Sequence, residues 1–285
     1  LYHLIFIVKI KIIMKVCILG NGLTSLMLAK ALVNEEIFVD IILTDKIKHF
    51  NRSRTLGISK TNIDFINKNI LDITKFLWNI DKIEVYTQKL KKEKVLNFEN
   101  KKKNLFAIIK NHQLFNHLIK KLDKNNFCNF KKNIINESII KNYNLIINCD
   151  PFNSITKKFF SKKIKKNYDS YAHTSIINHK KLINNNVAVQ IFTEIGPLAF
   201  LPVSETETSV VYSARGNKNL DLNKIINNCN TKYKIKKITK PYFFELKSSN
   251  LRNYYYKNVL AFGDLLHKIH PLAGQGFNMT IRDIK

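Results

Sequence analysis

Residues 15–32 read KVCILGNGLTSLMLAKAL, and this stretch decides the fold. Residues 16–19 are apolar, as in a buried strand, and the residues after position 22 place apolar side chains at helical spacing. Gly20 permits a tight turn between the two. Gly22 has no side chain, so the backbone can approach a pyrophosphate at the helix N-terminus, where free N–H groups and the helix dipole favour anions. Ser25 replaces the third glycine of the usual pattern and still allows close packing, so the stretch predicts a dinucleotide-binding βαβ unit.

A second strand is predicted at residues 38–43, shortly before Asp45. This acid follows the glycines by about 20 residues, where a carboxylate of a dinucleotide-binding fold accepts a hydrogen bond from a ribose hydroxyl. Because lysines lie close by in the sequence, a solvated surface turn remains the alternative for Asp45.

A second glycine-rich region lies near the other end of the chain. A predicted strand at residues 258–262 leads into Gly263 and Asp264, and the residues after Pro271 read LAGQG before a predicted helix. One carboxylate and one helix N-terminus would thus face the same ligand. Since this region is far in sequence from the first glycine turn, we expect one long ligand held from two sides.

Residues 263–283, GDLLHKIHPLAGQGFNMTIRD, resemble the second FAD motif of the flavin-dependent aromatic hydroxylases, in particular those of ubiquinone biosynthesis. Residues 54–59 (RTLGIS) are similar to the R-x-x-A-L-S segment of that family, and residues 196–202 (GPLAFLP) are similar to its GPLALLP strand. Asn111 with Leu114 and Leu118 resembles its N-x-x-L-x-x-x-L helix. The resemblance covers residues 14–283.

The resemblance implies a monooxygenase in which FAD is reduced by NADH or NADPH, reacts with O2 and delivers one oxygen atom to the ring of a prenylated phenol. It implies that the adenosine half of FAD lies near the first glycine turn, the ribityl or pyrophosphate region near Asp264, and the isoalloxazine near residues 274–276. It identifies no catalytic acid or base. The cofactor-binding residues that it implies are Gly20, Gly22, Leu23, Thr24, Asp45, Arg54, Asn111, Gly263, Asp264, Pro271, Gly274, Gln275, Gly276 and Asn278.

Two segments depart from the family pattern. Residues 149–154 read CDPFNS where the family has Ala-Asp-Gly, and Pro151 fixes φ near about −65°, which alters the turn associated with the nicotinamide cofactor. Leu265 and Leu266 replace two alanines and place bulk near the cofactor.

The expected fold is α/β: a Rossmann-type FAD-binding domain with a parallel sheet and helices, interrupted by a mostly antiparallel substrate domain. The FAD-binding domain would comprise residues 14–76, 100–165 and 251–285, and the substrate domain residues 77–99 and 166–250. Short strands are predicted at residues 171–177, 187–193, 198–203 and 209–214, as in an antiparallel sheet. We expect residues 1–13 to lie upstream of the native start, and the C-terminal helices of the family to be missing.

The composition limits the choice of partners. The chain has 48 Lys+Arg against 21 Asp+Glu, a formal charge of +27, but its lysines are spread over the whole length and form no RNA-binding signature. We therefore expect no nucleic acid, whereas weak attraction to anionic lipid headgroups fits the charge. The four cysteines form no CxxC pair, which argues against a disulfide framework or a zinc finger, and two histidines (His267 and His270) make too small a ligand set for a metal.

These features favour a cytoplasmic protein, with peripheral attachment to the inner membrane or to a ubiquinone-synthesis complex as an option. No apolar run is long enough to span a bilayer. Two alternatives stay open at this point: another FAD-dependent oxidoreductase built on the same frame, and a non-catalytic basic descendant that binds RNA or lipid.

Overall fold

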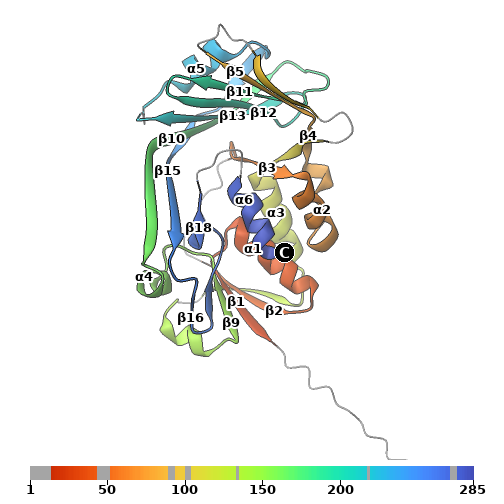
Figure 1. Cartoon of the computed structure of the whole chain (residues 1–285). Coiled ribbons are helices and arrows are strands. Elements are labelled where there is room, and N and C mark those ends of the chain that lie inside the picture. Colours follow the sequence, from red (N-terminus) through yellow and green to blue (C-terminus); the bar gives the residue numbers. More distant parts are fainter. Residues whose placement is uncertain are drawn as a thin grey trace, which may run out of the picture.

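The computed structural model describes residues 14–43, 52–88, 94–99, 104–132, 135–216, 219–269 and 275–285. The molecule is elongated: a parallel sheet covered by helices forms one end, and a large, mostly antiparallel sheet forms the other (Figure 1). Two long strands, β10 (Lys163–His179) and β15 (Tyr242–Leu251), run along one side between the two ends. Among the described helices, none is both long and apolar enough to cross a membrane.

The parallel sheet has β1 near its middle, in the order β16-β17-β9-β1-β2-β8. All neighbours are parallel except the pair β16 and β17. Residues 16–19 of β1 are buried, as expected for a strand covered on both faces. The predicted Rossmann-type sheet is therefore confirmed. Its strands are β1 (Lys15–Leu19), β2 (Phe38–Ile42), β8 (Cys128–Lys131), β9 (Leu145–Asn148), β16 (Tyr255–Tyr256) and β17 (Val259–Ala261).

Helices pack on the parallel sheet through apolar stripes. In α3 (Asn111–Leu122) the buried residues Leu114, Leu118 and Leu122 recur every four positions and meet α1 (Leu23–Asn34) in the main core. α6 (Gln275–Ile284) packs against α1 and against α2 (Lys60–Asn69). The opposite face of the sheet is covered by η2 (Glu137–Lys141) and α4 (Ser154–Phe159).

The large sheet follows the order β18-β15-β10-β13-β12-β11-β5-β6, with β14 (Ile235–Ile238) paired to β10. Its neighbours are antiparallel except β11 and β5, which are parallel. The four strands expected from the sequence are present, but the one expected at residues 171–177 is only part of the second half of the much longer β10. The helix α5 (Leu222–Cys229) adds to the core of this sheet. The further strands are β5 (Lys82–Thr87), β6 (Lys94–Glu99), β11 (Val187–Thr193), β12 (Gly196–Pro202), β13 (Glu207–Arg215) and β18 (His267–Lys268).

A third sheet of three strands, in the order β3-β7-β4, connects the two ends. It consists of β3 (Thr55–Ser59), β7 (Phe106–Lys110) and β4 (Trp78–Ile80), which follows η1 (Thr74–Phe76). Pairing does not follow the predicted division of the chain at every point: β4 pairs with β7 although it lies beyond the boundary at residue 77, and β18 pairs with β15 of the large sheet.

Polar side chains hold the large sheet against the three-stranded one. Ser53 Oγ lies 3.1 Å from Thr174 Oγ1, Thr55 Oγ1 donates to Ser209 Oγ at 3.0 Å, and Lys110 Nζ lies 2.6 Å from Glu207 Oε2. We call these three contacts the polar seam. The seam fixes the position of the large sheet over the ends of β3 and β7.

One buried carboxylate interrupts the apolar run of β2. Asp40 is 3% exposed, and it accepts hydrogen bonds from Lys131 Nζ at 2.7 Å, Tyr143 Oη at 2.7 Å and Asn129 Nδ2 at 3.2 Å. Burial would raise the pKa of this carboxyl, but the three hydrogen bonds outweigh it and hold the pKa below its ordinary value. Asp40 thereby ties β2 to β8 and to the segment before β9.

We predict that Asp40→Asn lowers the free energy of unfolding at pH 7 by about 2 kcal/mol, because charged hydrogen bonds are lost. The Asp40 pKa is lowered by folding, so its contribution is present above the unfolded pKa of about 3.9 and is lost as the pH falls through the folded value. Urea unfolding from pH 7 to pH 3 should show the variant and the unaltered chain converging below about pH 4.

The matched control is Asp64→Asn, which removes an exposed carboxylate paired with Lys60. It should cost less than about 1 kcal/mol. A difference between Asp40→Asn and the unaltered chain that stays constant down to pH 3 contradicts the role given to Asp40.

Candidate cofactor-binding site

Three loops meet at the carboxyl edge of the parallel sheet. They follow β1, β9 and β17, which are neighbours in the sheet. The Cys149 N–H donates to the Leu19 carbonyl at 3.0 Å, and the Phe262 N–H donates to the Asn148 carbonyl at 2.9 Å, so the pairing continues to the last residue of each strand. The two glycine-rich regions, more than half the chain apart in sequence, are therefore brought to the same edge, as the sequence predicts for a ligand held from two sides.

The glycines at this edge differ in why a side chain is absent. Gly20 has φ +107° and lies against Asp150, where an added Cβ would come within 3.4 Å of the Asp150 Cβ. Gly263 has φ +60°, and its Cβ would lie 2.5 Å from Thr24 Cγ2. Both positions therefore need glycine for the fold itself. Gly263 packs the loop after β17 directly onto the first turn of α1.

Gly22 is the exception, since a Cβ there would meet no described atom within 4 Å. Its φ is −74° and ψ 174°, an extended conformation that any residue adopts. The absence of a side chain at Gly22 thus leaves open space at the N-cap of α1. Neither the conformation nor the packing of the described residues requires glycine here, which fits a backbone that a ligand approaches closely.

The first turn of α1 has no side-chain cap and no acidic residue of its own. The N–H groups and the positive end of the helix dipole therefore face the edge where the three loops meet. Leu23 and Thr24 are the first two residues of this turn, and both are partly buried.

The loop after β9 closes a compact turn despite Pro151. The Phe152 N–H donates to Asp150 Oδ1 at 2.9 Å, and Thr156 Oγ1 donates to the Asp150 carbonyl at 2.6 Å. Asn153 caps α4 by accepting from the Thr156 N–H at 2.8 Å. The proline is thus accommodated by side-chain hydrogen bonds that hold Asp150 against the first glycine turn.

Cys149 lies where the three loops meet. Burial raises the pKa of its thiol to about 12, a hydrogen bond with Ser25 acts in the opposite sense, and the charges of Asp264 and Asp150 raise it further. The raised pKa favours the protonated thiol. Asp150 was not among the residues singled out for binding; its position two residues after the end of β9 is the sequence signal that points to it.

Asp264 is exposed, in the short helix η3 (Gly263–Leu265). Its carboxylate therefore borders the open space at the sheet edge rather than the core. Farther along, His267 Nε2 lies 3.2 Å from Asp283 Oδ2, which joins the beginning and the end of the second motif.

Arg54 and Asn111 are adjacent, because the Asn111 N–H donates to the Arg54 carbonyl at 3.0 Å. Arg54 is exposed, and Asn111 is 4% exposed at the first position of α3. Among the described residues, the Asn111 Oδ1 atom finds no hydrogen-bond partner, and neither does Nδ1 of the neighbouring His112. A buried amide oxygen without a partner is costly, which fits a group that hydrogen-bonds a ligand.

Asn278 has a structural task in this fold. Its Oδ1 accepts from the Ser59 N–H at 3.0 Å and from Asn62 Nδ2 at 2.9 Å, and its Nδ2 donates to the Gly57 carbonyl at 2.8 Å. The side chain thus fixes α6 to β3 and α2. The side chain therefore positions the first half of α6, and a role for Asn278 in cofactor binding stays a prediction.

The remaining predicted residues divide into two groups. Gln275 and Gly276 form the first turn of α6, and the nearest atom to an added Gly276 Cβ is Ile269 Cγ1 at 3.9 Å. Asp45, Pro271 and Gly274 lie outside the described residues. Within the described part of the chain, no group of three or more His, Cys, Asp or Glu side chains could hold a metal ion.

Comparison with known proteins finds relatives in sequence and in fold. The chain matches no protein-family profile. It is similar to the human ubiquinone biosynthesis monooxygenase COQ6, mitochondrial, with 27% identity over 49% of this chain and 39% of the human protein. The zebrafish (Danio rerio) protein of the same name is 24% identical over 49% of this chain and 38% of its own length. The chain thus spans well under half the length of these relatives.

Solved structures share the fold over nearly all of the chain. PqsL of P. aeruginosa superposes with a TM-score of 0.74 at 15% identity, covering 95% of this chain and 84% of PqsL. 2-Methyl-3-hydroxypyridine-5-carboxylic acid oxygenase gives 0.72 at 12% identity, covering 95% and 80%. A single-residue variant of Klebsiella pneumoniae HpxO, solved in complex with FAD, gives 0.71 at 13% identity, covering 95% and 79%.

The contact between Gly263 and Thr24 can be tested on stability alone. We predict that Gly263→Ala lowers the free energy of unfolding by about 1 to 3 kcal/mol, because the positive φ and the Thr24 methyl group both oppose a Cβ. Thr24→Ser removes that methyl group and should restore part of the loss in the double variant. Strictly additive effects in a urea-unfolding double-mutant cycle contradict the contact.

The sheet order, the convergent glycine loops and the sequence similarity agree with one another. The chain has the fold of the flavin-dependent monooxygenases, and over about half of its length it is homologous to the ubiquinone biosynthesis monooxygenases.

Proposed function

We propose that this protein is an FAD-dependent monooxygenase that hydroxylates the aromatic ring of a prenylated phenol in ubiquinone biosynthesis, with NADH or NADPH as reductant and O2 as oxidant. The observation that carries the proposal is the open space at Gly22, at the N-terminus of α1, whose first turn has no acidic residue, next to the loops that bear Asp150 and Asp264. The similarity to the ubiquinone biosynthesis monooxygenases supports the choice of reaction.

FAD fits the residues that are present. The first turn of α1 would hold the pyrophosphate through the N–H groups beside Gly22, and Asp264 would accept hydrogen bonds from hydroxyl groups of the cofactor. Asn111 Oδ1 would gain the partner it lacks among the described residues. The first turn of α6, at Gln275 and Gly276, would place backbone N–H groups beside the isoalloxazine. The binding of ribose by Asp45 stays a prediction.

The bound flavin supplies the redox chemistry with O2, and the protein supplies binding, orientation and exclusion of water. Positive helix ends, at α1 and at α6, would stabilise negative charge on the cofactor.

We place the substrate under the large sheet, with residues 77–99 and 166–250 as the substrate domain. The polar seam supports this, because Ser53 and Lys110, which contact the large sheet, are the immediate neighbours of Arg54 and Asn111. The large sheet therefore lies beside the proposed cofactor site and forms one wall of it.

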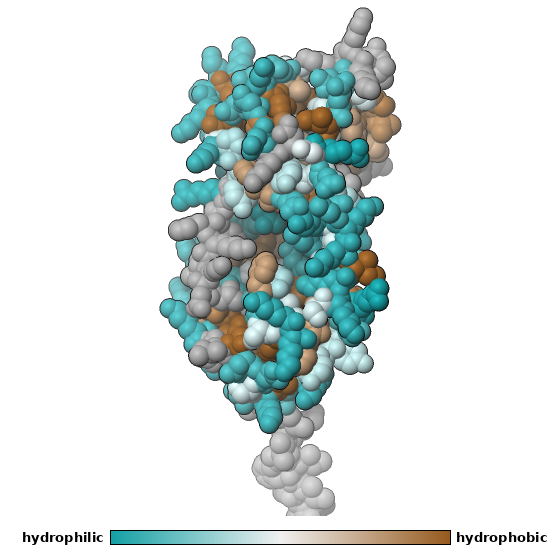
Figure 2. All heavy atoms as spheres, turned by 90° about the vertical axis from the view of Figure 1, so that its left-hand side faces the viewer, coloured by the Kyte–Doolittle hydropathy of each residue, from teal (hydrophilic) through white to brown (hydrophobic). Residues whose placement is uncertain are grey.

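We further propose that the protein works in the cytoplasm, at the periphery of a membrane, where a prenylated substrate is found. Figure 2 shows that hydrophilic side chains cover most of the face formed by the long strands β10 and β15. With a net charge of +27, such a surface is attracted to anionic headgroups. Binding to vesicles with anionic lipid that weakens as salt is raised would support this location.

A substitution at Gly22 tests whether FAD binds at the N-terminus of α1. We predict that Gly22→Val leaves the thermal unfolding temperature within about 3 °C, since no described atom opposes the new side chain, yet weakens FAD binding about tenfold or more, which corresponds to about 1.4 kcal/mol. The measurement is the visible absorption of the purified chain after titration with FAD.

Gly57→Ala is the matched control. Its Cβ would make ordinary contact with Phe106 at 3.5 Å, and the aromatic hydroxylases have alanine in the similar segment. It should bind FAD like the unaltered chain. If Gly22→Val binds FAD equally well, the pyrophosphate site is elsewhere.

The reaction is tested by its product. We predict that the FAD-loaded chain oxidises NADH or NADPH faster when a prenylated phenol is present, and that mass spectrometry finds the phenol with one added oxygen atom. Oxidation that yields only hydrogen peroxide favours another flavin-dependent oxidoreductase. Absence of FAD binding, together with salt-sensitive binding to RNA or lipid, favours the non-catalytic alternative.

A further inference from the structure

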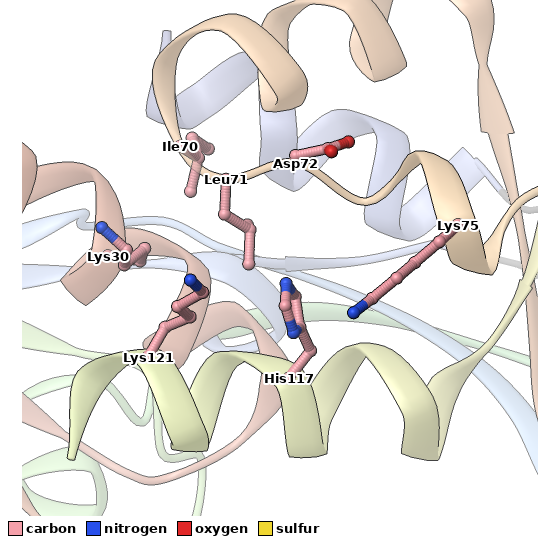
Figure 3. Close-up of a pocket in the computed structure, with 7 residues that line it drawn as sticks. All are labelled: Lys30, Ile70, Leu71, Asp72, Lys75, His117 and Lys121. Atoms are coloured by element: carbon pink, nitrogen blue, oxygen red, sulfur yellow. The ribbon is translucent and has the colours of Figure 1, made fainter. Parts of the chain in front are cut away.

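A cavity of about 410 Å³ lies away from the sheet edge, between α3, the second half of α1 and the segment that joins α2 to η1. Figure 3 shows that the side chains that line it come from three separate parts of the chain. Nothing in the proposed flavin site uses this cavity.

Three lysines from three elements converge on the cavity: Lys30 of α1, Lys75 of η1 and Lys121 of α3. Within the described residues, none of the three lies within ion-pair distance of a carboxylate, in contrast to Lys110 and Lys131, which pair with Glu207 and Asp40. The Lys30 amine donates to Asn34 Oδ1. Burial, and then the charge of Lys121, lowers the pKa of Lys30.

The carboxylate at the rim does not neutralise this group. Asp72 is exposed, and its Oδ1 accepts a hydrogen bond from the Thr74 N–H at 2.9 Å. In Figure 3 the Asp72 carboxylate points away from the space that the lysines border. The cavity therefore carries an excess of positive charge.

His117 and two apolar side chains complete the lining. The His117 ring packs against Phe76 with 5.0 Å between ring centroids. Burial lowers the pKa of His117, a hydrogen bond with the Asp72 backbone raises it, and the nearby charges of Lys75 and Lys121 lower it, with a net decrease. Ile70 and Leu71 are 3% and 8% exposed and form an apolar wall.

We propose that this cavity binds a small soluble organic phosphate, a phosphate monoester with a short apolar group. Three ammonium groups from three elements suit a dianion with several oxygens better than a carboxylate with two oxygens and one charge. Ile70 and Leu71 provide contact for the apolar group. The proposal does not rest on the proposed flavin function.

The probe is n-butyl phosphate, titrated at a fixed ionic strength of about 0.15 M so that general screening stays constant. Methyl NMR signals of Ile70 and Leu71 should shift and saturate, and inorganic phosphate should need a higher concentration because it lacks the apolar group. FAD is present at saturation throughout, so the helix N-terminus of α1 is already occupied.

The decisive comparison is Lys121→Gln against Lys120→Gln. Both lysines are exposed on α3 and both changes remove one charge, but Lys120 does not line the cavity. We expect Lys121→Gln to weaken binding about tenfold, or about 1.4 kcal/mol, and Lys120→Gln to change it less than about twofold.

Equal effects of the two variants would show general attraction to a basic protein and overturn the proposal. The same conclusion follows if the Ile70 and Leu71 signals do not saturate, or if only vesicles that contain a phosphate-monoester lipid shift them. Unaltered FAD absorption in both lysine variants keeps this test separate from that of the flavin site.

Discussion

The backbone pairing of β1 with β2 on one side and β9 on the other is the constraint on which the other features depend. Lys15 pairs with Phe38 and Leu19 with Ile42, while the same strand pairs with residues 145–148 of β9. Because all three strands are parallel, their carboxyl ends lie at one edge. The addition of β17 to β9 brings the C-terminal glycine region to that edge as well.

A few close contacts determine how the loops pack at the carboxyl edge of the parallel sheet. Gly20 against Asp150, and Gly263 against Thr24, allow three loops to approach one another without side chains between them. At Gly22, where the fold does not need glycine, an added Cβ would meet open space among the described residues. Gly20 and Gly263 are thus required by the fold, whereas Gly22 leaves room for a ligand. The same edge can therefore bind a long anionic cofactor.

Local patterns were sufficient for the parallel half of the fold. The strand, glycine turn and helix at residues 15–34 are encoded within about 20 residues, so the sequence predicts them directly. The strand and glycine turn at residues 258–264 and the short strands of the large sheet were also predictable, from the apolar pattern of the sequence and from its resemblance to the aromatic hydroxylases. These features depend on neighbours in sequence.

Features that depend on distant residues were not predictable. Asp40 interrupts an apolar strand, and only the fold shows that Lys131 and Tyr143 satisfy it. Asn278 was expected at the cofactor, but its amide is used by Ser59, Asn62 and Gly57, which lie more than 200 residues away. The length of β10 follows from pairing with both β13 and β15, which no local pattern reveals.

The most direct test of the central claim is a crystal structure of the chain with FAD. We predict that the pyrophosphate binds at the N-terminus of α1, with a phosphate oxygen about 3 Å from the backbone N–H of Leu23 or Thr24. The flavin ring should lie toward α6 and the large sheet. A pyrophosphate bound away from this helix N-terminus, with Gly22 facing solvent, would contradict this prediction.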